Sequence, residues 1–209
     1  MIELFSSALV TFLVIIDPPG CAPIFASLTR GASAIQRRGM AIRSSIIAWA
    51  ILMFFALLGR PMLHALGISL ASFRIAGGVM LFFIAIDMVF ERRTERREKR
   101  AEEIQNTPEV EDISVFPMAI PMIAGPGSIA SAMLWVSRAD TPLETTIVLL
   151  AITAVMLLTL VTLLAAGPLM RLIGEKIEAM ITRILGVILA ALATQFIVDG
   201  LKQSFPLLT

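Results

Sequence analysis

An apolar segment near the start of the chain is interrupted close to its middle by residues that oppose a helix. Residues 4–16 have the composition of a buried helix and residues 24–28 resume it, but the run from Asp17 to Pro23 contains an acid, three prolines and a glycine. Proline lacks the amide donor of a helix and clashes with the carbonyl group one turn back. It also biases the preceding residue toward extended geometry. We therefore expect the helix to break at Asp17.

The composition indicates that this segment crosses a membrane. Of the 209 residues, 57% are hydrophobic and 16% are charged, and the mean hydropathy is +0.89. A span of the hydrocarbon core, about 30 Å thick, needs roughly 17–25 apolar residues. Six segments qualify: 4–28, 40–59, 71–90, 115–137, 145–166 and 180–200. The sequence thus predicts an all-α membrane protein with six transmembrane helices, the first of them broken near the midplane.

Charge and composition exclude several classes of function. The net charge of +1 gives no basis for binding nucleic acid. The single cysteine, Cys21, excludes an internal disulfide, and the single histidine, His64, argues against an imidazole metal site. We expect no cofactor, no metal and no enzymatic activity.

The basic residues predict how the spans are oriented. Thirteen of the 17 lie at the first, third and fifth connections, and the other side has four: Arg60, Arg74, Arg138 and Lys202. Cytoplasmic loops are enriched in Lys and Arg, so both termini are expected outside the cytoplasm. The N-terminus has no basic region or small-residue cleavage site, so the first segment is expected to remain as a span. Residues 91–112 form a charged linker between two parts, 1–90 and 113–209.

The two parts resemble each other. Pro19-Gly20 recurs as Pro126-Gly127, and Pro61 with Gly67 recurs as Pro168 with Gly174, with the same separation in sequence for each match. The run Arg74–Gly77 recurs as Arg183–Gly186 at a slightly larger separation, with Leu185 in place of Ala76. Because each part has three spans, the second must run through the membrane upside down relative to the first. Such inverted repeats are typical of secondary transporters, whose site lies at the midplane between discontinuous helices.

The fourth span contains a second break, at the position that matches the first. Pro121, Gly125, Pro126 and Gly127 lie near the centre of this span. We expect a half-helix to start near Ser128, with Ser128 as its N-cap. Its free amides and the positive end of its dipole would suit a carboxylate.

These motifs carry a resemblance to a known family. The run Asp17–Phe25, Ala119-Ile120-Pro121 followed by Ala124-Gly125-Pro126, and Ala193-Thr194-Gln195 followed by Asp199-Gly200 resemble the MarC family of prokaryotic inner-membrane proteins. The resemblance covers essentially the whole chain. It implies transport of small neutral amino acids such as glycine and alanine, as in SnatA-like members, and a relation to LysE-type exporters. One departure is Cys21, at a position that is commonly asparagine in the family.

Asp17 is the main candidate for a functional side chain. An acid at bilayer depth is costly and usually functional, which favours binding of substrate or a proton. Burial opposes its charge whereas a substrate ammonium supports it, so one residue would couple proton release to substrate binding. The alternatives are a cap for the second half-helix or an ion pair with a buried arginine.

The remaining candidates each have a structural alternative. The backbone at Pro18, Gly20, Gly125, Pro126 and Gly127 would open toward a cavity, or form kinks that only improve packing. Cys21 and Ser128 would contact substrate, or serve as small packing residues. Gln195 would contact substrate, or form a hydrogen bond between helices. Snorkelling to the interface accounts for Arg74, Asp87, Arg183 and Asp199.

The sequence leaves three functions open. The first is a secondary carrier for small neutral amino acids in the lipid bilayer, as a monomer or a homo-oligomer. The second is an ion channel in which Asp17 acts as a cation site. The third is an intramembrane enzyme with Ser128 as nucleophile, which the expected distance of His64 from the midplane disfavours.

Overall fold

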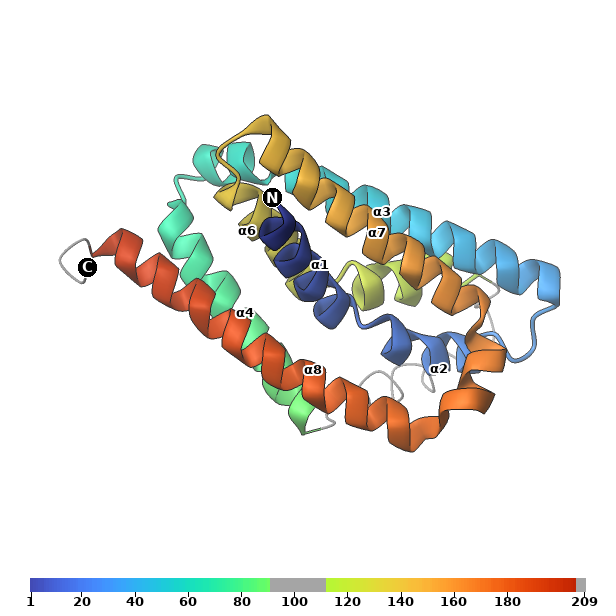
Figure 1. Cartoon of the computed structure of the whole chain (residues 1–209). Coiled ribbons are helices and arrows are strands. Elements are labelled where there is room, and N and C mark those ends of the chain that lie inside the picture. Colours follow the sequence, from blue (N-terminus) through green and yellow to red (C-terminus); the bar gives the residue numbers. More distant parts are fainter. Residues whose placement is uncertain (91–111, 206–209) are drawn as a thin grey trace.

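The computed structural model describes residues 1–90 and 112–205, apart from the side chains of residues 169–176 and 178. Every regular element in these ranges is helical (Figure 1). In chain order the elements are α1 (Ile2–Ile16), α2 (Pro18–Leu28), α3 (Ala34–Ala65), α4 (Leu70–Val89), η1 (Ser114–Ile123), α6 (Pro126–Arg138), α7 (Pro142–Leu164) and α8 (Ala166–Ser204). The predicted linker lies outside the described residues, apart from Asp112.

The expected spans are present. Five helical segments of the described chain are long and apolar enough to cross a membrane, and there are six if η1 and α6 are counted as one bent span. Their lengths differ from the prediction. The helix α3 starts before the predicted 40–59 because Ser33 and Gln36 form a capping box. The helix α8 runs through the predicted fifth connection because Pro168 lies in its first turn, where no amide donor is needed.

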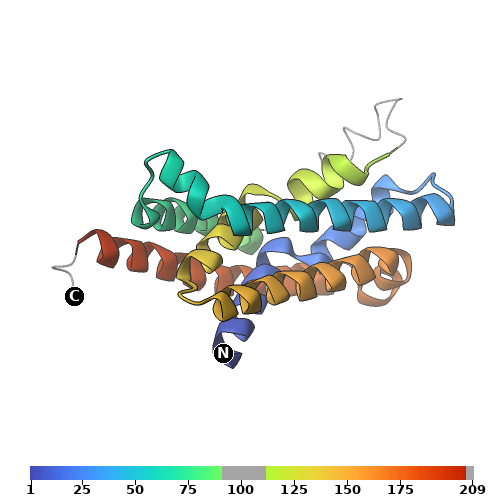
Figure 2. The same cartoon turned by 90° about the horizontal axis from the view of Figure 1, so that it is seen from above.

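The two broken spans lie in the middle of the molecule. In Figure 1 the pair α3 and α7 lies on one side and the pair α4 and α8 on the other, with α1 and α6 between them; Figure 2 shows the same helices from above. In the first span, Ile2–Leu28, 72% of the most apolar window is buried, against 28–44% in the four unbroken spans. The breaks are therefore surrounded mainly by protein, which is where irregular backbone at membrane depth is tolerated.

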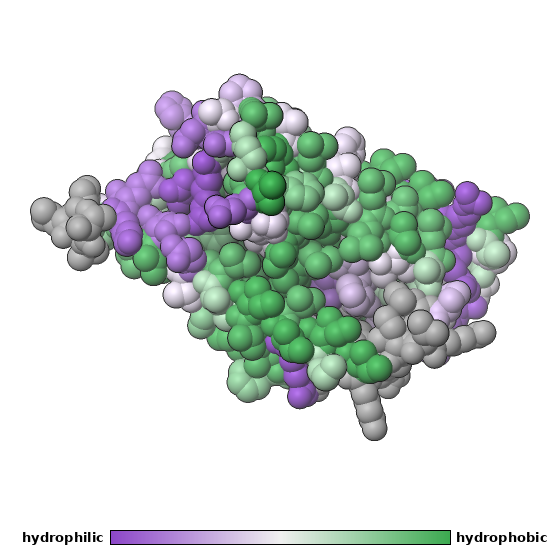
Figure 3. All heavy atoms as spheres, viewed as in Figure 1, coloured by the Kyte–Doolittle hydropathy of each residue, from purple (hydrophilic) through white to green (hydrophobic). Residues whose placement is uncertain are grey.

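The outer surface of the molecule is largely apolar. Figure 3 shows hydrophobic side chains over the middle of one face and hydrophilic ones gathered toward the helix ends. Large exposed apolar residues occur on every unbroken span, for example Phe54, Phe83, Leu157 and Val187. An apolar surface of this extent is typical of a protein in lipid.

Two glycines allow α4 and α8 to pack closely. A Cβ atom at Gly78 would lie 2.8 Å from the carbonyl oxygen of Ala193, and one at Gly200 would lie 2.9 Å from that of Ala71. In membranes, where lipid is as apolar as the side chains, helix association depends on such close backbone approach. The helices α4 and α8 therefore form an antiparallel pair with glycine at two contact points.

The start of η1 is held against α3. The carboxylate of Asp112 accepts a 2.9 Å hydrogen bond from the Ser114 amide and lies 3.1 Å from Nη2 of Arg43. The hydrogen bonds from Ser114 lower the pKa of Asp112, and the charge of Arg43 adds to them. Within η1 the backbone is extended at Phe116 and Ile120, each of which precedes a cis proline. This half of the fourth span is thus irregular before the break.

Candidate functional site at the two helix breaks

The first break is present at Asp17, as predicted. The helix α1 ends at Ile16, Asp17 adopts the left-handed conformation (φ 57°, ψ 66°), and α2 begins at Pro18. Asp17 is only 2% exposed, and its Oδ1 accepts a 3.1 Å hydrogen bond from the Gly20 amide. Asp17 is therefore the N-cap of α2, which was the structural alternative to a binding role.

The second break is sharper and lies next to the first. The segments η1 and α6 are bent by 55°, with Ala124 and Gly125 between them. A Cβ atom at Gly127 would lie 3.6 Å from Cγ2 of Ile15, in the last turn of α1. The two interruptions of the chain are thus brought together at the centre of the molecule.

The prediction that Ser128 is the N-cap of the second half-helix is wrong. The helix α6 begins at Pro126, and Gly125 is its N-cap with no side-chain hydrogen bond. Proline suits the first helical position because its missing amide is not needed there. Ser128 lies in the first turn, and its hydroxyl donates a 2.8 Å hydrogen bond to the Ile123 carbonyl.

Cys21 and Ser128 make equivalent contacts. The Cys21 thiol lies 3.4 Å from the carbonyl oxygen of Ile16, and the Ser128 hydroxyl bonds to that of Ile123, which precedes it by the same number of positions. Ile16 and Cys21 match Ile123 and Ser128 with the separation that relates Pro19-Gly20 to Pro126-Gly127. In both breaks a small side chain thereby satisfies a carbonyl group that the interrupted helix leaves free.

The two half-helices differ in how their first amides are satisfied. Pro18 and Pro19 have no amide hydrogen, and the Gly20 amide bonds to Asp17, so α2 satisfies its own N-terminus. In the first turn of α6, only Pro126 lacks a backbone amide hydrogen. For the amides of Gly127 and Ser128, the described part of the chain supplies no acceptor. Amides at the second and third helical positions are the groups that bind anions at helix N-termini.

The glycines at the breaks permit specific close contacts. A Cβ atom at Gly20 would lie 2.2 Å from Oδ2 of Asp17, and one at Gly125 would lie 2.5 Å from the Pro121 carbonyl oxygen. At Gly127 it would meet Cδ1 of Ile84 at 2.4 Å. In the described conformation, side chains of α1 and α4 therefore cover the first turn of α6.

Gln195 is placed in a different cluster. Its side chain is exposed on α8 and donates a 2.7 Å hydrogen bond to Oδ1 of Asp199, whose Oδ2 is paired with Arg138. The Arg138 guanidinium lies 4.2 Å from the ring centroid of Phe196 and 5.4 Å from that of Trp135. Snorkelling alone therefore does not account for Asp199. Sequence reasoning missed this ion pair because its partners lie on helices that are far apart in the chain.

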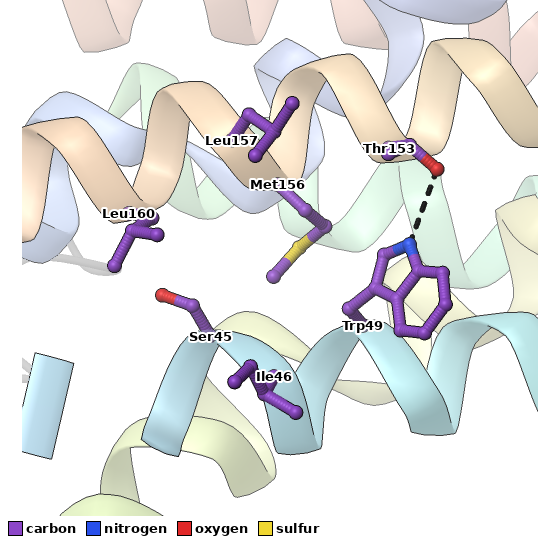
Figure 4. Close-up of a pocket in the computed structure, with 7 residues that line it drawn as sticks. All are labelled: Ser45, Ile46, Trp49, Thr153, Met156, Leu157 and Leu160. Carbon is purple, nitrogen blue, oxygen red and sulfur yellow. Dashed lines mark hydrogen bonds between the residues drawn. The ribbon is translucent and has the colours of Figure 1, made fainter. Parts of the chain in front are cut away.

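A second polar contact lies between α3 and α7. The Trp49 indole donates a 3.1 Å hydrogen bond to Oγ1 of Thr153 at one side of a cavity of about 160 Å³. Figure 4 shows the residues around it, which are Ser45, Ile46, Trp49, Thr153, Met156, Leu157 and Leu160. The separation that relates the two breaks also relates Ile46 to Thr153 and Trp49 to Met156. Matching positions of the two halves therefore meet at this cavity.

The fold and the breaks define a multi-pass integral membrane protein. Comparison with known proteins then identifies its family. A family described as MarC family integral membrane protein matches residues 2–205. The chain therefore belongs to the MarC family, as its motifs suggested.

Relatives in archaea and bacteria match over nearly their whole length. A UPF0056 membrane protein of Archaeoglobus fulgidus is 34% identical over 203 residues, which cover 97% of this chain and 94% of that protein. The UPF0056 membrane protein MJ1677 of Methanocaldococcus jannaschii is 36% identical over 96% of this chain and 97% of its own length. YvbG of Bacillus subtilis, also a UPF0056 membrane protein, is 32% identical over 96% of this chain and 95% of its own. No solved structure matches the chain.

Proposed function

We propose that this protein is a secondary transporter that moves small neutral amino acids, of the glycine and alanine class, across the prokaryotic inner membrane. Both termini lie outside the cytoplasm in this proposal, as the distribution of basic residues favours. The observation that carries the proposal is the juxtaposition of two helix breaks that differ in capping. One break presents a carboxylate, and the other presents amides with no acceptor in the described chain.

The two groups suit the two ends of an amino acid. The substrate carboxylate binds the amides of Gly127 and Ser128 at the N-terminus of α6, where the helix dipole favours negative charge. The ammonium group lies near the Asp17 carboxylate. The apolar side chains of Ile15, Leu81 and Ile84 lie around Gly127 and would have to move for the substrate carboxylate to reach its amide, which favours a small substrate.

The transport mechanism is alternating access by two inverted three-helix halves. Three observations support the repeat. Cys21 and Ser128 make the same contact at matching positions of the two halves. Matching residues of α3 and α7 line one cavity. The helices α3 and α7 also run in opposite directions side by side (Figures 1 and 2), as equivalent spans of an inverted repeat do.

Proton coupling through Asp17 is part of the proposal. Asp17 is 2% exposed and lies at the first break, where the substrate ammonium is placed in this proposal, so the same carboxylate is available to a proton and to the substrate. Collapse of the pH gradient should slow uptake. Unaffected uptake would reject proton coupling but not the proposal that the protein is a carrier.

Reconstitution of the purified protein in liposomes tests the main claim. We expect saturable uptake of labelled glycine and alanine that stops when Asp17 is replaced by asparagine. Absence of saturable uptake would reject the proposal, as would wild-type uptake by Asp17→Asn. A unitary conductance in single-channel recordings would favour an ion channel instead.

A further inference from the structure

The C-terminal end of each half-helix that begins at a break accepts a hydrogen bond from an arginine of another helix. Arg37, in the first turn of α3, donates a 3.4 Å hydrogen bond to the carbonyl oxygen of Thr29, the C-cap of α2. Arg74, in α4, donates a 3.4 Å hydrogen bond to the carbonyl oxygen of Ser137 in the last turn of α6. Thr29 is 1% exposed and Ser137 4%. A cation at the end of each helix also complements the helix dipole.

The two accepting residues are alike in a second respect. The Thr29 hydroxyl donates a 2.7 Å hydrogen bond to the Phe25 carbonyl, and the Ser137 hydroxyl donates one of the same length to the Leu134 carbonyl. Each hydroxyl is thus used within its own helix. Only the backbone carbonyl group is offered to the arginine, so the two contacts are built in the same way.

The same two arginines reach opposite ends of α8. Nη1 of Arg74 donates a 2.9 Å hydrogen bond to Oε1 of Gln203 in the last turn of α8. At the other end, a Cβ atom on Gly167, in the first turn of α8, would lie 3.8 Å from Nη1 of Arg37. The long helix α8 extends along the whole molecule in Figures 1 and 2. Arg74 therefore joins α6 to the end of α8 by hydrogen bonds, and Arg37 is bonded to α2 and lies beside the start of α8.

Neither guanidinium group is fully satisfied. The Nε atoms of Arg37 and Arg74 are both buried, and neither has a hydrogen-bond partner in the part of the chain that the structure describes. A buried donor without a partner raises the free energy of the state that contains it. The bonds to the two half-helices are also long for hydrogen bonds from nitrogen to oxygen. The two contacts are therefore suited to being made and broken.

We propose that Arg37 and Arg74 are paired latches, one at each face of the membrane. Each docks the end of one half-helix against α8, and release of either one opens the path to the helix breaks from that face alone. This deepens the proposed transport function and rests on it, because alternating access requires separate control of the two faces. Both arginines are positioning residues that act through α2 and α6.

The single cysteine of the sequence gives a direct test. Cys21 is buried, and it lies one turn after the first break. Its rate of modification by a membrane-impermeant thiol reagent, added to right-side-out or inside-out vesicles, therefore reports access to the breaks from each face. We expect Arg74→Gln to raise this rate about tenfold from the face where α6 ends and less than about twofold from the other face. Arg37→Gln should show the reverse preference.

Matched variants separate a latch from general loosening. Arg60→Gln and Arg38→Gln remove exposed arginines near the same two ends of the molecule, and they should leave the rates unchanged. Arg74→Lys and Arg37→Lys keep a donor and a charge, so they should give intermediate rates. Equal acceleration from both faces, or no acceleration in either glutamine variant, would overturn the proposal.

The labelling assay and the flux assay can fail separately. Sided labelling of Cys21 in the absence of glycine flux would support the latches and reject the proposed substrate. If the wild type transports glycine and neither arginine variant changes the labelling rate of Cys21, the proposed latches are rejected and the proposed transport function stands.

Discussion

The two helix breaks occupy matching positions in the sequence and make the same kind of side-chain contact, but their half-helices begin differently. At the first break, two prolines remove donors and Asp17 accepts the Gly20 amide. At the second, Ala124 occupies the position that matches Asp17, and the amides of Gly127 and Ser128 have no acceptor in the described ranges. The first half-helix is capped by its own acid, whereas the second has no acid of its own, and side chains of α1 and α4 cover its first turn.

In the proposed function, this difference lets two matching breaks bind the two unlike ends of one ligand. An amino acid carries one anionic and one cationic group. Two identical breaks would offer the same group twice, whereas one acid and one set of amides offer complementary partners. At the matching positions, Asp17 and Pro18 of the first break are replaced by Ala124 and Gly125 at the second, so two changes of residue type accompany the difference.

Replacement of Asp17 should have the largest effect, and two substitutions separate its roles. Asparagine keeps an acceptor for the Gly20 amide and tolerates positive φ, so Asp17→Asn should retain stability but reduce transport by at least about tenfold through loss of a charged partner. Asp17→Ala should reduce transport equally. It should also destabilise the protein by about 1–3 kcal/mol, because alanine cannot cap the helix and is strained at φ 57°.

Uptake assays and thermal unfolding in detergent measure the two quantities separately. If Asp17→Asn transported normally while Asp17→Ala lost stability, Asp17 would be a cap and nothing more. The contrast between the two breaks would then concern helix structure alone.

Gly127→Ala should have the next largest effect, and it acts only at the second break. The added methyl group would lie 2.4 Å from Cδ1 of Ile84, and such overpacking costs about 1–3 kcal/mol. Ile84→Val removes Cδ1, so the double variant should recover part of the lost stability. A double-mutant cycle on unfolding free energies gives the coupling between the two sites. Additive effects would show that α4 does not cover this turn.

The sequence predicted the positions of both breaks because proline and glycine act locally on the backbone. It did not identify the N-cap of α6, because Gly125 has no side chain to signal a cap. Pro126 at the first helical position was the available signal. The pairing of Arg138 with Asp199 depends on how distant helices pack, which no local pattern encodes. The contact of Ile84 with Gly127 is unpredictable for the same reason.

Gly20→Ala should have a smaller effect, confined to the first break. Its methyl group would lie 2.2 Å from Oδ2 of Asp17, so the carboxylate would have to leave the cap at a cost of roughly 0.5–2 kcal/mol. In an Asp17→Ala background the same change should cost almost nothing, since the clashing group is absent and alanine favours helix. Thermal unfolding of the four proteins in this cycle provides the check. An equal cost in both backgrounds would mean that the Asp17 carboxylate does not pack against Gly20.

The smallest effects should come from Cys21 and Ser128, where the two breaks are most alike. Ser128→Ala leaves the Ile123 carbonyl without its 2.8 Å donor, and it should destabilise the protein by about 0.5–1.5 kcal/mol. Cys21→Ala should cost less, because a thiol is a weak donor at 3.4 Å from the Ile16 oxygen. Cys21→Ser should raise the unfolding midpoint slightly, because a hydroxyl is a stronger donor to that oxygen. If Cys21→Ser instead lowered the midpoint as much as Ser128→Ala does, the shared contact would not stabilise the two breaks in the same way, and their equivalence would be limited to their matching positions in the sequence.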